Sequence, residues 1–137
     1  MSILRRIFGV ILGFVVASAV MLLVEFTNGH LFYPEVGAAA KLVTTAAQMK
    51  ALMAQVPVGS LAVVIVGWLL GSIVGGWAAT RIARSESTGP ALSLGLLLTL
   101  AGISNNLMMP PPTWFWVVSL PVFFPGTWYG ARVAGSR

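Results

Sequence analysis

The segment that decides the fold runs from Leu61 to Arg84 and reads LAVVIVGWLLGSIVGGWAATRIAR. Its apolar part is about 20 residues long, the length that a helix needs to cross the hydrocarbon core of a bilayer. Small residues recur at every fourth position, which places them on one face of such a helix: Gly67, Gly71, Gly75 and Ala79. The pattern therefore predicts a membrane-spanning helix with a face that lets a second backbone approach closely.

The composition of the whole chain supports a membrane protein. Of its 137 residues, 58% are hydrophobic and 8% are charged, and the mean hydropathy is +0.93. One soluble core cannot bury so much apolar surface, so lipid is the expected solvent. The net charge of +5 does not indicate a nucleic-acid partner, because the arginines lie singly or in pairs at the ends of apolar runs. The absence of cysteine excludes disulfides and thiolate chemistry, and no cofactor is expected.

Four apolar segments predict an all-α, polytopic fold with four transmembrane helices in a single domain, residues 1–137. The segments cover about 7–27, 61–80, 91–109 and 113–131. The first follows Arg5 and Arg6 and reads as an uncleaved span, although Ala17-Ser18-Ala19 resembles a signal-peptide cleavage site and leaves that alternative open. The last contains Pro121 and Pro125, which predict a bend near its middle.

The connection between the first two spans predicts an amphipathic helix over about residues 34–56. Asn28 and Gly29 are expected to end the first span in the left-handed conformation that asparagine and glycine tolerate. Pro34 and Glu35 then suit the first turn of a new helix. Its apolar residues recur at helical spacing with polar residues opposite, so we expect it to lie on the membrane surface or to cover the bundle.

The basic residues predict the orientation in the membrane. One side of the predicted topology carries Arg5, Arg6, Arg81, Arg84, Arg132 and Arg137, whereas the other carries only Lys41 and Lys50. Short loops rich in arginine stay in the cytoplasm, so both termini are expected there and the connector is expected outside.

Small residues predict where helices pack closely. The candidates are Gly9, Gly13, Gly67, Gly71, Gly75, Gly126 and Gly130. The first two spans are expected to pack on each other or on a copy of themselves. Residues 75–83 also align with residues 126–134 by glycine, tryptophan, arginine and a final alanine. Either the chain is two parallel helical hairpins, or any span that runs inward ends with an interfacial tryptophan and an arginine.

Polar side chains near the outer ends of the spans form the candidate polar site: Glu25, His30, Tyr33, Asn105, Asn106 and Trp114. Glu25 is the one carboxylate inside an apolar run, and such residues are candidates for function because their burial is expensive. The alternative is an interfacial carboxylate paired with His30, a connector lysine or water. One histidine cannot build a metal site. The two asparagines either bond between helices or bind a ligand.

Several short motifs carry a family resemblance: Glu25 with Gly29-His30 and Tyr33-Pro34, Gly75-Gly76-Trp77, and Ala101-Gly102-Ile103 through Asn105 to Pro110, Pro112 and Trp114-Phe115. Together with the arginine-led first span, they resemble an uncharacterised family of small four-helix bacterial inner-membrane proteins. The resemblance implies a bacterial inner membrane and the four-helix fold, and it implies no activity. Pro111 stands where that family is expected to have a histidine, which weakens any site built on two histidines.

Three classes of function remain. The expected one is a structural or accessory protein that binds another membrane protein, or itself, through its glycine faces. The alternative is a small oligomeric transporter or channel that uses Glu25 in an outward-facing site. The chain looks like the small multidrug-resistance exporters in having four short spans and a glutamate in the first. In that family, however, the carboxylate lies at the centre of its helix and there is no long amphipathic connector. An enzyme is not expected, because no nucleophile, base and orienting group occur at recognisable spacing.

Overall fold

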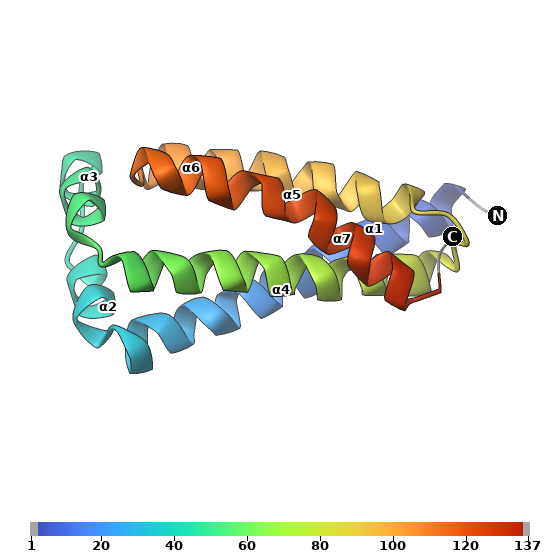
Figure 1. Ribbon diagram of the computed structural model, residues 1–137, viewed down its shortest axis with the longest axis horizontal. Coiled ribbons are helices and arrows are strands. Elements are labelled where there is room, and N and C mark those ends of the chain that lie inside the picture. Colours follow the sequence, from blue (N-terminus) through green and yellow to red (C-terminus); the bar gives the residue numbers. More distant parts are fainter. Residues whose placement is uncertain (1–2, 136–137) are drawn as a thin grey trace.

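The computed structural model describes residues 3–135 as an elongated bundle of helices (Figure 1). Three helices are long and apolar enough to cross a membrane. They are α1 (Ile3–Thr27), α4 (Val58–Ala83) and α5 (Gly89–Met108). A π-helical turn, Asn28–Phe32, continues α1. They run side by side, with α2 and α3 at one end of the bundle and both ends of the chain at the other (Figure 1). The prediction of an all-helical fold is confirmed, and three of the four predicted spans correspond to helices that could cross a membrane.

The predicted fourth span is not one continuous helix. It consists of α6 (Thr113–Ser119), a 3-10 turn (Leu120–Val122) and α7 (Phe123–Val133). Pro121 lies inside the turn, where it has no N–H for the helical hydrogen bond and its ring crowds the preceding turn. The interruption that the prolines predicted is therefore present, and neither helical piece is long enough to cross a membrane alone.

The connector is two short helices, so the prediction of one amphipathic helix is wrong. They are α2 (Pro34–Lys41) and α3 (Ala46–Gln55). Thr45 caps α3, because its Oγ1 accepts the Gln48 N–H at 3.1 Å while the Gln48 Oε1 accepts the Thr45 N–H at 3.2 Å. This reciprocal capping box starts a new helix with an extended Thr45, which breaks the helical run. Met53 of α3 is buried and covers the end of the core.

Asn28 and Gly29 do not end α1 in the left-handed conformation, and that prediction is also wrong. Within residues 3–135, only Arg84 and Gly135 have positive φ. Instead, the Tyr33 N–H donates to the Asn28 carbonyl at 2.7 Å and winds the chain into a π-helical turn. Asn28 is buried, and its side-chain amide donates to the Ser60 carbonyl and hydroxyl at 3.1 and 3.2 Å. Asn28 therefore joins the end of α1 to the start of α4.

Glycines on α1 and α4 lie directly against the opposite helix. A Cβ atom added to Gly13 would lie 2.9 Å from the Gly75 carbonyl oxygen, and one added to Gly75 would lie 2.9 Å from the Gly13 carbonyl oxygen. Gly9 meets the Ala79 backbone in the same way, and Gly71 meets Ala17. Small residues such as glycine and alanine allow two helix backbones to approach so closely. The two glycine faces thus pack on each other within one chain.

The remaining glycines of the predicted set also face neighbours in the same chain. Gly67 packs against Val24 of α1, whereas Gly126 and Gly130 of α7 pack against Ser72 and Ile73 of α4. Helices α4 and α7 both end with an arginine over a tryptophan. The Arg81 guanidinium lies 5.9 Å from the Trp77 ring centre in α4, and the Arg132 guanidinium lies 5.7 Å from the Trp128 ring centre in α7. Helix α4 is therefore the central helix, with α1 on one glycine face and α7 on another.

Candidate functional site

A polar groove of about 240 Å³ lies between α1 and α5 and has Trp68 of α4 and Phe123 of α7 in its walls. Its polar members come from two helices that are far apart in sequence: Ser18 and Glu25 from α1 and Asn105 from α5. The other residues that line it are Phe14, Met21, Leu22, Leu98, Ala101 and Gly102. One carboxylate, one amide and one hydroxyl thus share an otherwise apolar groove. We call it the Glu25 groove.

The aromatic wall of the Glu25 groove is held in place by packing. Trp68 is 5% exposed, and its ring lies 5.2 Å from Phe123 in a stacked arrangement and 5.5 Å from Phe115 edge to face. Gly102 allows the Phe123 ring to approach α5, because a Cβ atom there would lie 2.7 Å from Phe123 Cε2. Trp68, Gly102 and Phe123 were not among the predicted site residues, since their apolar character predicts only a core position.

Glu25 lies deeper than the sequence predicted. The π-helical turn carries α1 on to Phe32, so the carboxylate is seven residues, about 10 Å, from the end of that helix. Within residues 3–135, its side chain makes no hydrogen bond or ion pair. An ionised carboxylate accepts hydrogen bonds and attracts cations, and in hydrocarbon it is strongly destabilised unless a positive charge or a proton joins it. The Glu25 groove is therefore suited to a cation.

Two members of the predicted polar site lie elsewhere. The His30 ring stacks on Phe26 with 4.1 Å between ring centres, and its Nδ1 lies 2.9 Å from the Phe26 carbonyl oxygen. The expected pair of Glu25 with His30 is therefore absent. Tyr33 packs with its hydroxyl end against Gly59. Both residues belong to the junction that joins α1 to the connector, because the π-helical turn leads the chain away from α5.

The other two members, Asn106 and Trp114, are also outside the Glu25 groove. Asn106 is 1% exposed, and its amide makes no hydrogen bond within the described chain, so the expected bond between helices is not formed there. Trp114 packs edge to face on Phe115 at 6.0 Å. Successive residues of an α-helix differ by about 100° in direction, so only one of two adjacent asparagines faces a given groove. The predicted convergence of six residues thus reduces to Glu25 and Asn105.

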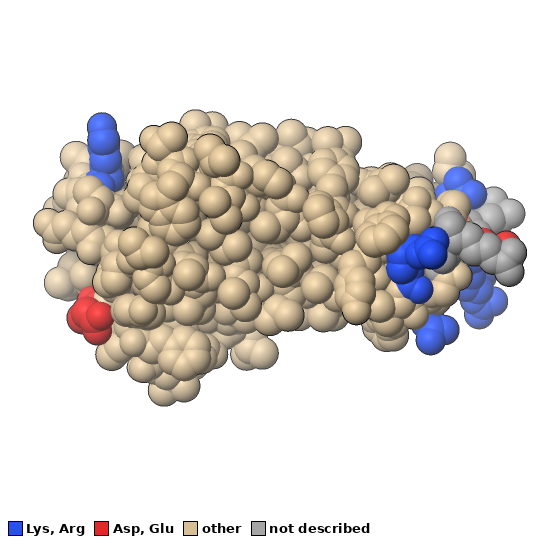
Figure 2. Space-filling view, viewed as in Figure 1, with Lys and Arg blue, Asp and Glu red and all other residues tan. Residues whose placement is uncertain are grey.

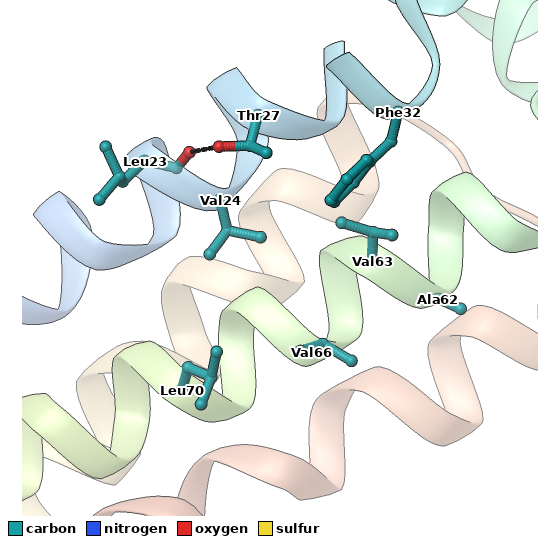
Figure 3. A pocket seen from close by; sticks show the side chains of 8 residues that line it. All are labelled: Leu23, Val24, Thr27, Phe32, Ala62, Val63, Val66 and Leu70. Carbon is teal, nitrogen blue, oxygen red and sulfur yellow. Dashed lines mark hydrogen bonds between the residues drawn. The ribbon is translucent and has the colours of Figure 1, made fainter. Parts of the chain in front are cut away.

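A second groove, of about 430 Å³, lies between α1 and α4 and has no free polar group (Figure 3). Its walls are Leu23, Val24, Thr27, Phe32, Ala62, Val63, Val66 and Leu70. The one hydroxyl in it belongs to Thr27 and donates to the Leu23 carbonyl at 2.9 Å (Figure 3). This groove presents hydrocarbon alone, so an apolar chain fits it and a charged ligand does not. We call it the apolar groove.

The described residues provide no cluster of metal ligands. Within residues 3–135, no three histidine, aspartate or glutamate side chains lie close enough to hold a metal ion. The candidate site is the Glu25 groove, where a carboxylate and an amide share one depression. Comparison with known proteins adds no assignment, since no family model, no curated protein and no solved structure matches this chain.

Proposed function

We propose that the chain crosses a bacterial inner membrane four times, with α6, the 3-10 turn and α7 as the fourth crossing. Residues 113–133 extend over about 30 Å at helical rise, which matches the hydrocarbon core. Arginines gather at the end of the bundle where the chain begins and ends, which supports cytoplasmic termini (Figures 1 and 2). The Trp–Arg contacts at the ends of α4 and α7 are compatible with the two-hairpin repeat, which stays a prediction.

We further propose that this protein is a small carrier that binds a hydrophobic organic cation in the Glu25 groove. The observation that carries the proposal is the presence of Glu25 and Asn105 in one groove beside Trp68. The carboxylate attracts positive charge in surroundings of low dielectric constant, and the aromatic and aliphatic walls contact the hydrophobic part of the ligand. The Asn105 amide offers hydrogen bonds that orient the ligand. A proton takes the place of the cation when the groove is empty, so cation binding releases a proton.

The test measures binding of benzyltrimethylammonium, a compact aromatic cation, to the full chain in nanodiscs. Glu25→Gln keeps the shape of the side chain and removes its charge. We expect it to weaken binding about tenfold or more, the size of one charge-assisted contact. The same change is expected to abolish cation-driven proton flux in reconstituted vesicles.

Glu35→Gln is the matched control, because Glu35 is exposed on α2, away from the groove. Its affinity for the cation is expected to equal that of the wild type. Equal affinity in wild type and Glu25→Gln would refute the role of the carboxylate. Failure of the wild type to bind the probe at millimolar concentration would refute the carrier altogether.

The second candidate is an accessory protein that binds a membrane-protein partner or a copy of itself. The glycine faces are occupied within the chain, so such a partner needs another surface. The apolar groove favours this role, because Leu23, Val63 and Leu70 line an apolar depression between α1 and α4 (Figure 3). A transmembrane helix with large apolar side chains fits such a depression.

A photo-crosslinker at Val63 distinguishes this role from the carrier. A stoichiometric crosslink to one membrane protein, with a matching pull-down in mild detergent, would support the accessory role. Crosslinks to lipid alone would exclude a partner at this surface. Val118, which is exposed on α6, provides the control position.

A further inference from the structure

Arginines gather at the end of the bundle that holds both chain ends (Figure 2). Arg81 and Arg132 lie over the rings of Trp77 and Trp128, within their own helices. Arg5 and Arg84 instead line one groove between the start of α1 and the end of α4. Neither of these two guanidinium groups makes an ion pair or hydrogen bond within residues 3–135. The pair therefore presents two positive charges to whatever occupies the groove.

The floor of this groove is apolar. It measures about 650 Å³, and the residues that line it besides the two arginines are Leu4, Ile7, Phe8, Ile11 and Ile82. Ile7, Phe8 and Ile11 are each at least half exposed, so they are available for contact. Ile11 lies six residues, about 9 Å, further along α1 than Arg5. Positive charge at one end and hydrocarbon along the length match the two parts of a phospholipid. We call it the arginine groove.

The backbone of Arg84 carries an independent indication. Arg84 follows α4 in the left-handed conformation, with φ 52° and ψ 42°. This position after a helix is typically glycine, because a Cβ atom is strained there. A chain rich in glycine nevertheless has arginine at the one position of positive φ that closes a long helix. Strained backbone positions of this kind cluster at functional sites, and the Arg84 side chain lines the arginine groove.

We propose that the arginine groove binds one anionic phospholipid of the cytoplasmic leaflet. Its phosphate lies between Arg5 and Arg84, and its acyl chain runs along Ile7, Phe8 and Ile11. Guanidinium groups bind phosphate strongly and in a fixed geometry. A zwitterionic lipid brings an ammonium group toward the same two positive charges, so the groove prefers a lipid with net negative charge. The proposal is independent of the Glu25 groove.

Native mass spectrometry of the full chain tests the proposal. The protein is exchanged from detergent into mixtures of phosphatidylglycerol and phosphatidylcholine, and the retained lipids are counted. The wild type is expected to keep one phosphatidylglycerol in preference to phosphatidylcholine. Arg84→Gly is expected to lower that preference about fivefold, whereas Arg84→Lys keeps the charge without the guanidinium geometry and is expected to lower it less.

Two features keep the test decisive. Glycine relieves the strain at position 84, so Arg84→Gly is expected to unfold at the same or a higher temperature than the wild type, and a loss of lipid cannot be attributed to misfolding. Arg132→Gln removes an arginine from the same end but outside the groove, and it is expected to leave lipid preference unchanged. Equal retention of both lipids by the wild type would overturn the proposal. So would an equal loss in Arg84→Gly and Arg132→Gln, because it would show only diffuse surface charge.

Discussion

Gly75→Ala tests the contact that sets the distance between α1 and α4. The added methyl group would lie 2.8 Å from Ala17 Cβ and 2.9 Å from the Gly13 carbonyl oxygen. Carbon atoms in favourable contact are about 3.5–4.0 Å apart, so the two helices must separate by about 1 Å. Overpacking of this kind costs about 1–3 kcal/mol, and the better helix propensity of alanine offsets up to about 1 kcal/mol. We expect a net loss of about 1–2 kcal/mol, because backbone atoms cannot rotate away.

The assay is unfolding by SDS in mixed micelles, followed by tryptophan fluorescence and far-UV circular dichroism. Gly29→Ala is the matched control, because a Cβ atom there would lie 3.5 Å from its nearest neighbour, an ordinary contact. Its stability is expected to stay within about 0.5 kcal/mol of the wild type. Wild-type stability of Gly75→Ala would refute the close contact. A loss that grows or shrinks with the protein-to-detergent ratio would show that the glycine face joins two chains.

The remaining predictions concern two asparagines. Asn28→Ala removes the buried hydrogen bonds to Ser60, so hydrogen exchange at the start of α4 is expected to accelerate and stability to fall by about 1–2 kcal/mol; unchanged exchange would contradict the contact. Asn106→Leu replaces a buried amide that has no hydrogen-bond partner in the described chain. The free energy of unfolding in SDS is expected to rise by about 1 kcal/mol. A fall in that free energy would show that the amide is paired in the membrane.

The sequence predicted the helical class and three helices that are long and apolar enough to cross a membrane. These follow from composition and from the length of apolar runs, both of which are local properties of the chain. It also predicted the break at Pro121, because a missing N–H acts within one turn. It failed at the connector and at the end of α1. The side chains of Thr45, Gln48 and Asn28 make specific hydrogen bonds there that composition does not reveal.

The candidate site depended far more on tertiary structure. The sequence identified Glu25 and Asn105 as residues of interest, yet it grouped them with four residues that the structure places elsewhere. Which of Asn105 and Asn106 faces α1 depends on the rotation of α5, and a step of about 100° decides it. Phe123 forms a wall of the groove because Gly102 allows its ring to approach α5.

By itself, the sequence predicted a helical membrane protein, the approximate length of its apolar helices and the position of its arginines at the ends of apolar runs, because hydrophobicity and charge act residue by residue. Only the tertiary structure decided that the glycine faces meet each other within one chain, that Glu25 shares a groove with Asn105, and that Arg5 and Arg84 line one groove. These pairings join helices far apart in sequence. Their register is set by packing of glycine against backbone, which no local pattern specifies.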